Sequence, residues 1–393
     1  MTARFRSFVV VACVCVLLFA PGLGAVQAAP GAPGEPPRAF VPVLSSGSPQ
    51  AASNFVLKSE NAAAPVDTAA YWTAERMMAA EPLDLLLAPD VDLAAVDAAD
   101  AAGEVQGASG AFPSKLPDPK ALALAQELYA DQWAMLEEID AAGAPVEGAA
   151  VDESLAWRES PPFTRYSVNY YGESWKQFPY KAMGRLFFTI PGRGNASCSA
   201  SSAGGRSVWT AGHCLYTRGI GWHTNIVFVP AYRYGVAPYG KFYETNAIVS
   251  YEWWANEDHA YDIGMVIVGN RNGMKLSQWV GNLGFQYNRS GTQQFFAFGY
   301  PGNIGSGRYL IACAARTQTR YAIAGPDPVG IGCDMTQGSS GGPWLVGFFP
   351  YAAGSINYVN GVVSFGSSAY PNQFFASYFG TRAKELWDWG RVQ

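Results

Sequence analysis

The part of the chain after Lys181 is built from short apolar runs separated by Gly, Asn and Pro, and this pattern limits the possible folds more than any other feature. The runs are rich in β-branched and aromatic residues, which favour strands. They lie at 184–190, 225–229, 247–251, 263–268, 294–299, 309–313 and 361–365. Many short strands between turns predict an all-β sandwich or barrel fold. A closing helix is expected at 381–389.

The first 29 residues have the pattern of a secretory signal peptide. Arg4 and Arg6 precede an apolar run at 7–19, and small residues follow at 25–29. The run is shorter than the roughly 20 residues of a spanning helix, so cleavage near Ala28 or Ala29 is favoured over a retained membrane anchor. We therefore expect an extracellular protein that is free of the membrane after cleavage. Four of the six cysteines remain in this oxidising compartment, and an even number suggests disulfides.

Charge divides the remaining chain into two parts. Residues 30–165 carry 21 acidic and seven basic side chains, a net charge of −14, whereas residues 166–393 carry 10 and 17, a net charge of +7. The acidic part is rich in Ala and Pro and is expected to be partly disordered and largely extended up to Pro117. A helix is predicted near 118–142, with Asp118 as its N-cap and Pro119 at its first position. A solvated linker helix is one interpretation; we favour a propeptide that docks on the basic domain at 166–393.

Three short motifs carry the candidate chemistry. Thr-Ala-Gly-His-Cys at 210–214 places the imidazole of His213 at the end of a strand. Asp262 begins an otherwise apolar strand, where a carboxylate is costly to bury unless a donor pairs with it. Gly-Ser-Ser-Gly-Gly-Pro at 338–343 forms a tight turn that exposes Ser340 and directs backbone N–H groups into one pocket.

A serine is a weak nucleophile unless a base accepts its proton and a third group orients that base. His213, Asp262 and Ser340 supply these three groups, in that order along the chain. Other candidates exist for each role. Asp258 lies close to Asp262, Ser339 is a second hydroxyl, and His223 and His259 are expected to be surface or turn histidines.

In these motifs and their order the chain resembles the chymotrypsin-like serine peptidases. The resemblance spans about residues 184–380 and implies two antiparallel six-stranded β-barrels with the active site between them. It implies a serine endopeptidase that cleaves polypeptides through an acyl-enzyme, with the N–H groups of Gly338 and Ser340 as the oxyanion hole. Ser339 stands where many animal relatives have an aspartate, so the chain is most similar to the bacterial glutamyl endopeptidase-like group. Two disulfides are predicted, Cys198–Cys214 and Cys313–Cys333.

The resemblance leaves the specificity for the substrate's P1 residue open. Asp334, next to Met335, lies six residues before Ser340, where trypsins place the carboxylate that receives Arg or Lys. Glutamyl-specific relatives often carry a histidine at the position of Val363. Substrate backbone is expected to pair with 364–366, namely Ser364, Phe365 and Gly366.

Other function classes fit the sequence less well. An α/β-hydrolase needs a histidine after the serine, and none follows Ser340. A metal hydrolase would need a ligand cluster such as H-E-x-x-H, so no metal or cofactor is expected. The net charge of −5 argues against a nucleic-acid binder. We expect a monomer. The competing hypothesis is a binding or adhesion protein that keeps the barrels without turnover.

Overall fold

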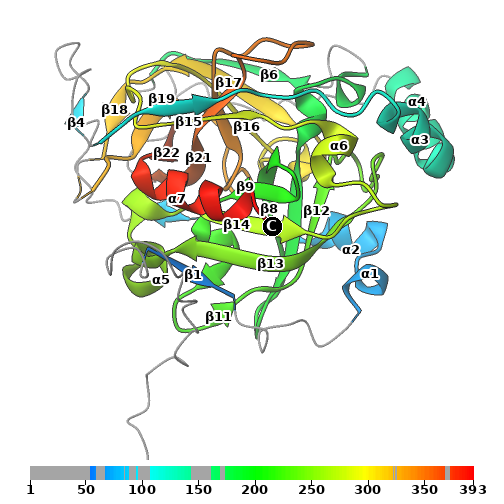
Figure 1. The fold of residues 1–393 in the computed structure, drawn as a ribbon, viewed down its shortest axis with the longest axis horizontal. Helices are drawn as coiled ribbons and strands as arrows, with labels where there is room; N and C mark the ends of the chain where they lie inside the picture. The colour runs from blue at the N-terminus through cyan, green and yellow to red at the C-terminus, as the bar shows by residue number, and fades with distance from the viewer. Residues whose placement is uncertain are drawn as a thin grey trace, which may run out of the picture. The chain divides into compact units, whose positions relative to one another are not determined.

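The protein is represented by a computed structural model, drawn in Figure 1, that describes part of its 393 residues. The described ranges are 54–58, 67–83, 85–87, 94–95, 107–142, 161–168, 173–321, 323, 325–367 and 372–393. The predicted signal segment and residues 143–160 lie outside them. Within the described ranges, no helix has the length and apolar character needed to cross a bilayer.

A closed antiparallel barrel of six strands forms the first half of the basic domain. The strands follow one another in the order β13–β12–β7–β8–β9–β14, and β14 pairs with β13 to close the ring. Their bounds are β7 Met183–Ile190, β8 Gly194–Gly204, β9 Ser207–Thr210, β12 Thr224–Pro230, β13 Phe242–Ser250 and β14 Gly264–Val268. Large apolar side chains such as Phe187, Ile248 and Met265 are completely buried and form the core.

Six further antiparallel strands form the second half, in the order β19–β22–β21–β20–β16–β17. They are β16 Gln294–Gly299, β17 Ile311–Arg316, β19 Val329–Gly332, β20 Pro343–Val346, β21 Tyr358–Ser367 and β22 Gln373–Tyr378. Among the described residues, the outer strands β17 and β19 share no ladder of hydrogen bonds. A disulfide with a Cα–Cα distance of 5.6 Å joins Cys313 on β17 to Cys333, the residue directly after β19. This half is therefore a curved sheet closed by a covalent bond.

The remaining elements connect or cover these two halves. They are α5 Tyr251–Asn256, α6 Leu276–Val280, α7 Thr381–Gly390, β6 Thr164–Ser167, β10 Tyr216–Thr217, β11 Gly221–Trp222, β15 Gly284–Tyr287 and β18 Thr319–Arg320, together with the 3₁₀ turns η5 Ser174–Lys176, η6 Tyr180–Ala182, η7 Gly212–Cys214, η8 His259–Tyr261 and η9 Gly305–Gly307. The C-terminal helix α7 packs against the first barrel through buried Ala383 and Leu386. A Cβ at Gly390 would lie 2.1 Å from Met265 Sδ, so the end of α7 lies directly on β14.

The predicted strands and the closing helix are present, but some boundaries differ, and the strand expected at 309–313 begins at Ile311. The run 247–251 was expected to be a strand to its end, but Tyr251 begins α5. Ser250 caps this helix, because its Oγ accepts a hydrogen bond from Trp253 N. The local capping signal thus ends the strand one residue early.

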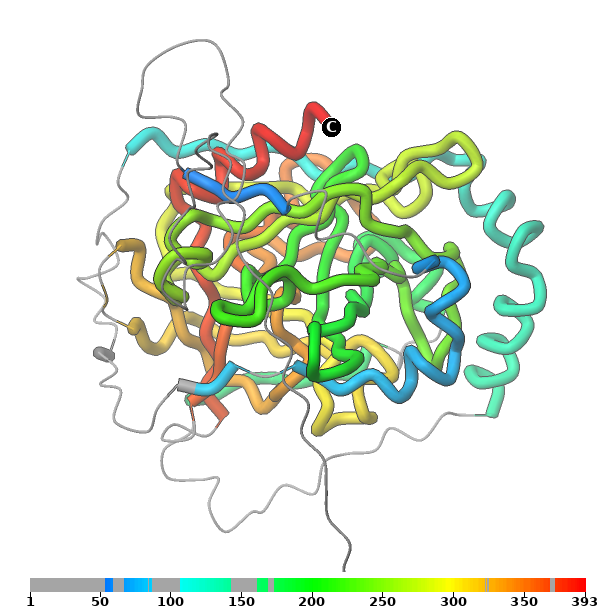
Figure 2. Tube along the Cα trace, turned by 90° about the horizontal axis from the view of Figure 1, so that it is seen from below, coloured from blue at the N-terminus to red at the C-terminus, as the bar shows by residue number. Residues whose placement is uncertain are grey.

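The acidic leader contains more structure than its composition predicts. Among the described residues before Pro117, the expected extended chain is interrupted by two short helices, and it also forms five short strands. They are β1 Phe55–Leu57, α1 Thr68–Tyr71, α2 Ala74–Ala79, β2 Glu81–Pro82, β3 Leu86–Leu87, β4 Ala94–Ala95 and β5 Gly110–Phe112. These strands add to both halves: β1 pairs with β13, β2 with β8, β3 with β21, β4 with β18 and β5 with β15. Figure 2 shows the leader, from blue to teal, along the outside of the basic domain.

The predicted leader helix is divided in two. Helices α3 Ala121–Leu128 and α4 Ala130–Ala141 meet at Tyr129, whose φ of −126° is not helical. The Tyr129 ring lies 6.5 Å from that of Trp279 on α6, and this tertiary contact accompanies the break between the two helices. Asp118 and Pro119 precede the helix rather than begin it, because the Asp118 carboxylate accepts from Lys120 N in a turn.

Candidate active site

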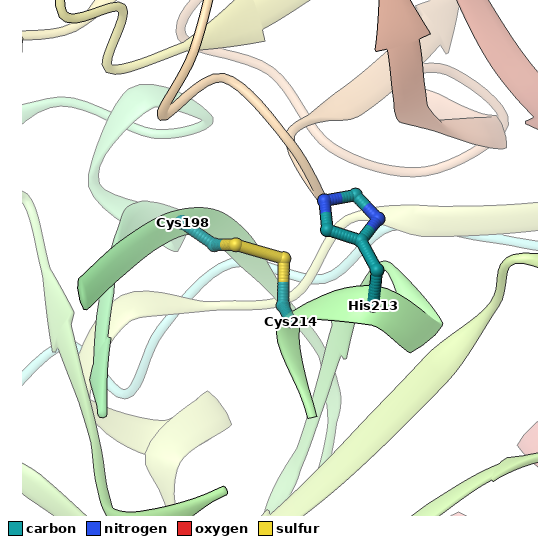
Figure 3. Close-up of side chains that lie close together, drawn as sticks. All are labelled: Cys198, His213 and Cys214. Carbon is teal, nitrogen blue, oxygen red and sulfur yellow. A yellow bond between two sulfur atoms is a disulfide. The ribbon is translucent and has the colours of Figure 1, made fainter. Parts of the chain in front are cut away.

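His213 lies on the short turn η7 that follows β9. Figure 3 shows that His213 and Cys214 leave the same turn, and that the disulfide from Cys214 reaches Cys198 on β8 while the imidazole points away. Gly212 is required here, since a Cβ would lie 2.7 Å from the Trp253 ring and 3.1 Å from Asp262 Oδ1. The turn therefore holds the imidazole close against the residues that follow η8.

Asp262 is fully buried and binds His213 through both carboxylate oxygens. Its Oδ2 lies 2.7 Å from His213 Nδ1, and its Oδ1 accepts from the backbone N–H of His213 at 2.8 Å. Burial alone would raise the pKa of Asp262, but the attraction of His213 and the hydrogen bonds from His213 and Ser364 outweigh it and lower this pKa. An ionised Asp262 accepts a hydrogen bond from Nδ1–H, which leaves Nε2 of a neutral His213 as an acceptor. This Nε2 is buried and has no partner among the described residues.

Ser340 lies in a turn with a glycine in a left-handed backbone conformation on each side of it. Gly338 and Gly341 have φ angles of +88° and +79°. A Cβ at Gly341 would lie 2.1 Å from Thr210 Oγ1 and 2.8 Å from Ala211 N, so this turn packs against the backbone that leads to His213. The structure thus brings the Ser340 turn beside η7, although no hydrogen bond joins Ser340 to His213.

Two serines, Ser199 and Ser364, form hydrogen bonds that support the site, and the sequence analysis did not predict these bonds. Ser199 N donates to Ser340 O at 2.7 Å, and Ser199 Oγ donates to Gly338 O at 2.8 Å. Ser364 was expected to meet substrate through its backbone; its hydroxyl donates to Asp262 Oδ2 at 2.5 Å. In the sequence, Ser199 could have been noticed because it directly follows Cys198. Ser364 could have been noticed because it carries the one hydroxyl in the apolar run 361–365.

The candidate specificity residues have partners of their own. The Asp334 carboxylate forms an ion pair with Arg165 on β6, while Asn303 Nδ2 donates to Asp334 O at 2.8 Å. Burial raises the pKa of Asp334 despite the attraction of Arg165. Met335 is buried in the second half. A basic substrate side chain would therefore compete with Arg165 for this carboxylate.

The rival groups lie elsewhere. Asp258 caps η8 by accepting from Ala260 N at 3.0 Å. His259 lies on the turn η8, as expected. His223 is not a surface or turn histidine, because it is completely buried, stacks on Phe188 with ring centroids 4.8 Å apart, and binds Cys214 O. The metal-type groupings Cys198–His213–Cys214 and Cys313–Cys333–Asp334 contain disulfide sulfurs, which are not thiolate ligands.

Comparison with known proteins finds proteases. No family model matches the chain. An extracellular metalloprotease of Bacillus subtilis (strain 168) is 29% identical over 105 residues, which are 26% of this chain and only 33% of that protein, so the match spans about a third of the relative. Among solved structures, protease Anisep from Arthrobacter nicotinovorans is 33% identical over 55% of this chain and 99% of its own, with a TM-score of 0.48. The thermostable serine protease AL20 from an extremophilic microorganism is 30% identical over 55% of this chain and 98% of its own, with a TM-score of 0.49.

The two solved proteases are matched over nearly their whole length at 30% identity or more. The bonded pair of His213 and Asp262, with the Ser340 turn beside it, agrees with that similarity. On the identity and its coverage, the chain belongs to the trypsin-fold serine proteases.

Proposed function

We propose that the protein is a secreted serine endopeptidase, made as a precursor, in which Ser340, His213 and Asp262 form the catalytic triad. The observation that carries the proposal is the 2.7 Å contact between His213 Nδ1 and Asp262, which leaves Nε2 unpartnered next to the Ser340 turn. A base held in this tautomer is what a serine nucleophile needs.

The reaction then proceeds in two halves. Ser340 Oγ bonds to the carbonyl carbon of a peptide while its proton passes to His213 Nε2. His213 gives this proton to the leaving amine as the C–N bond breaks, and water releases the acyl group from Ser340 by the same exchange. Asp262 keeps its charge throughout and stabilises the imidazolium. The N–H groups of Gly338 and Ser340 bind the oxyanion, and each such donor is worth roughly 2.7–4 kcal/mol in comparable sites.

The acidic leader fits the role of a propeptide, residues 30–165, removed by a cut between Arg158 and Lys181. Its charge of −14 against +7 on the rest of the chain favours docking. Helix α4 supplies specific contacts: Trp133 Nε1 donates to Pro238 O at 2.8 Å, Asp140 pairs with Arg233, and Glu137 lies 3.0 Å from Lys176. The two disulfides fit an oxidising, extracellular location.

A fluorophosphonate probe tests the catalytic assignment, because it bonds covalently to an activated serine. The processed form from culture medium should carry one label, on Ser340, and should lose it in Ser340→Ala. Cleavage of casein by the same sample shows turnover. A correctly folded protein that neither reacts nor cleaves would instead be the inactive binding protein of the competing hypothesis.

A further inference from the structure

One stretch of the leader crosses from the first barrel to the second. We call residues 81–83 and 85–87 the crossing segment. At its start β2 pairs in parallel with β8, with Glu81 opposite Ala196 and Pro82 opposite Ser197. Leu83 N then donates to Ser197 O at 2.9 Å. At its end β3 pairs in parallel with β21 on the second half. The segment therefore bridges the two halves that flank the Ser340 turn.

Between these two ladders the segment occupies a proposed oxyanion donor. The carbonyl oxygen of Leu83 accepts a hydrogen bond from Gly338 N at 2.8 Å. Pro82 packs on the same glycine, since a Cβ at Gly338 would lie 2.8 Å from Pro82 Cβ. A substrate carbonyl that needed the Gly338 N–H would have to displace Leu83.

The segment also occupies the strand that is expected to receive substrate backbone. Leu85 O accepts from Gly366 N at 3.1 Å, and Leu86 lies opposite Gly366 in the ladder. The half-buried Leu85 side chain packs against the buried pair Phe365 and Phe375. Oxyanion donor and substrate strand are thus bound by one continuous stretch of the leader.

The direction of the segment is opposite to that of a peptide that could be cleaved. In hydrolysis the leaving amine takes its proton from His213, which lies on the first barrel and is tied to β8 by the disulfide Cys198–Cys214. The acyl half stays on Ser340, on the side of β21. A productive peptide must therefore run from β21, before its reacting carbonyl, towards β8 after it. The crossing segment runs the other way, because β2 precedes Leu83 and β3 follows it.

We propose that the crossing segment is a built-in inhibitor that fills the substrate groove in reverse, and this inference rests on the proposed function. Its carbonyl groups satisfy the N–H groups of Gly338 and Gly366, but its chain direction is the reverse of that of a cleavable peptide. Anchors upstream keep it in place: Trp72 is 1% exposed and its Nε1 donates to Asn225 O at 2.6 Å, and Met77 is equally buried. A tethered segment has a high effective concentration, so it does not need high intrinsic affinity.

The test compares precursors that retain the leader, using the rate at which a fluorophosphonate probe labels Ser340. Leu85→Lys places a charge against Phe365 and Phe375 and should speed labelling at least about tenfold, equivalent to about 1.4 kcal/mol. Leu116→Lys is the matched control, because Leu116 is 57% exposed in the leader and lies outside the crossing segment, and it should label at the wild-type rate. Leu85→Ala, checked by thermal unfolding, replaces the lysine variant if the latter does not fold, with the same direction of change.

Two results would overturn the inference. Equal labelling of the folded Leu85 variants and wild type would show that the segment does not block the site. A cut between Leu83 and Asp84 in the purified wild-type precursor, seen by mass spectrometry, would show that the segment is bound as a substrate. The processed form serves as an independent reference: if it does not label at all, the proposed function fails rather than the inhibitor.

Discussion

Ser364 Oγ donates a 2.5 Å hydrogen bond to Asp262 Oδ2, the same carboxylate oxygen that faces His213 Nδ1. The acidic group from the first barrel is therefore fixed by a hydroxyl from β21 of the second half. This contact ties the orientation of His213 to the packing of both halves against each other.

Ser364→Ala should lower kcat/KM about 10- to 100-fold, because a hydrogen bond to a buried charge is worth about 1.5–3 kcal/mol. Ser364→Thr keeps the hydroxyl and should retain more activity. Ser377→Ala is the control, since the Ser377 hydroxyl is also buried but donates to His259 O. Steady-state kinetics on a peptide substrate distinguish the three variants; equal losses in Ser364→Ala and Ser377→Ala would contradict this role.

Ser340→Ala should remove peptide hydrolysis by several orders of magnitude and leave the fold intact, because only the nucleophile is lost. Ser339→Ala provides the comparison: the Ser339 hydroxyl is buried without a partner among the described residues, and its removal should change the rate little. Casein cleavage and circular dichroism measure the two properties. Near wild-type cleavage by Ser340→Ala would refute the assignment of the nucleophile.

Loss of either disulfide should destabilise the protein, by about 3 kcal/mol on the chain-entropy model for loops of this length. Replacing Cys198 and Cys214 by Ser should also lower activity, because that bond holds the turn of His213. Replacing Cys313 and Cys333 should separate β17 from β19. Thermal unfolding gives the stability, and peptide mapping without reduction checks the pairing. Free thiols or a crossed pair in the wild type would be inconsistent with the structure.

His223 should make the protein less stable in acid. Burial lowers its pKa to about 3 from 6.5, so below pH 6.5 the unfolded chain binds a proton that the folded chain refuses. The contribution of this residue to folding therefore falls as pH drops from 6.5 to about 3, by up to about 1.4 kcal/mol per pH unit. His223→Gln should flatten this part of the curve of unfolding free energy against pH. An unchanged slope would show that other groups cause the acid sensitivity.

If the leader is cut off as proposed, it should stay bound to the rest of the chain in part through salt-insensitive contacts. The exposed pair Glu137–Lys176 weakens as salt screens charge, whereas burial of Trp133 persists. We expect the leader to copurify at low salt and less completely at high salt. Trp133→Ala should release the leader at both low and high salt. Met135→Ala, on the exposed face of α4, should not change its release. Release that is complete for wild type at high salt would show that charge alone holds it.

Local signals predicted the motifs around His213, Asp262 and Ser340 and most strands of the two halves, because each rests on neighbouring residues. The end of α7 was predicted within one residue for the same reason. Strands β2 and β3 could not be predicted, since each has two residues and is defined by a partner more than 100 positions away. Likewise, nothing near Arg165 in the sequence indicates that it pairs with Asp334. The burial of His223 depends on Phe188 in another strand.

The Cys313–Cys333 disulfide makes the conformation of the loop between Cys333 and Ser340 dependent on the redox state of the surroundings. Elsewhere in the two halves, neighbouring strands are joined by ladders of hydrogen bonds, whereas β17 and β19 are joined by shared core packing and by a disulfide that ends at Cys333, seven residues before Ser340. In a reducing compartment, the disulfide between Cys313 and the residue after β19 would not form, and no covalent bond would link β17 to β19. Full closure of this side of the second half, close to the turn of the proposed nucleophile Ser340, therefore needs an oxidising environment.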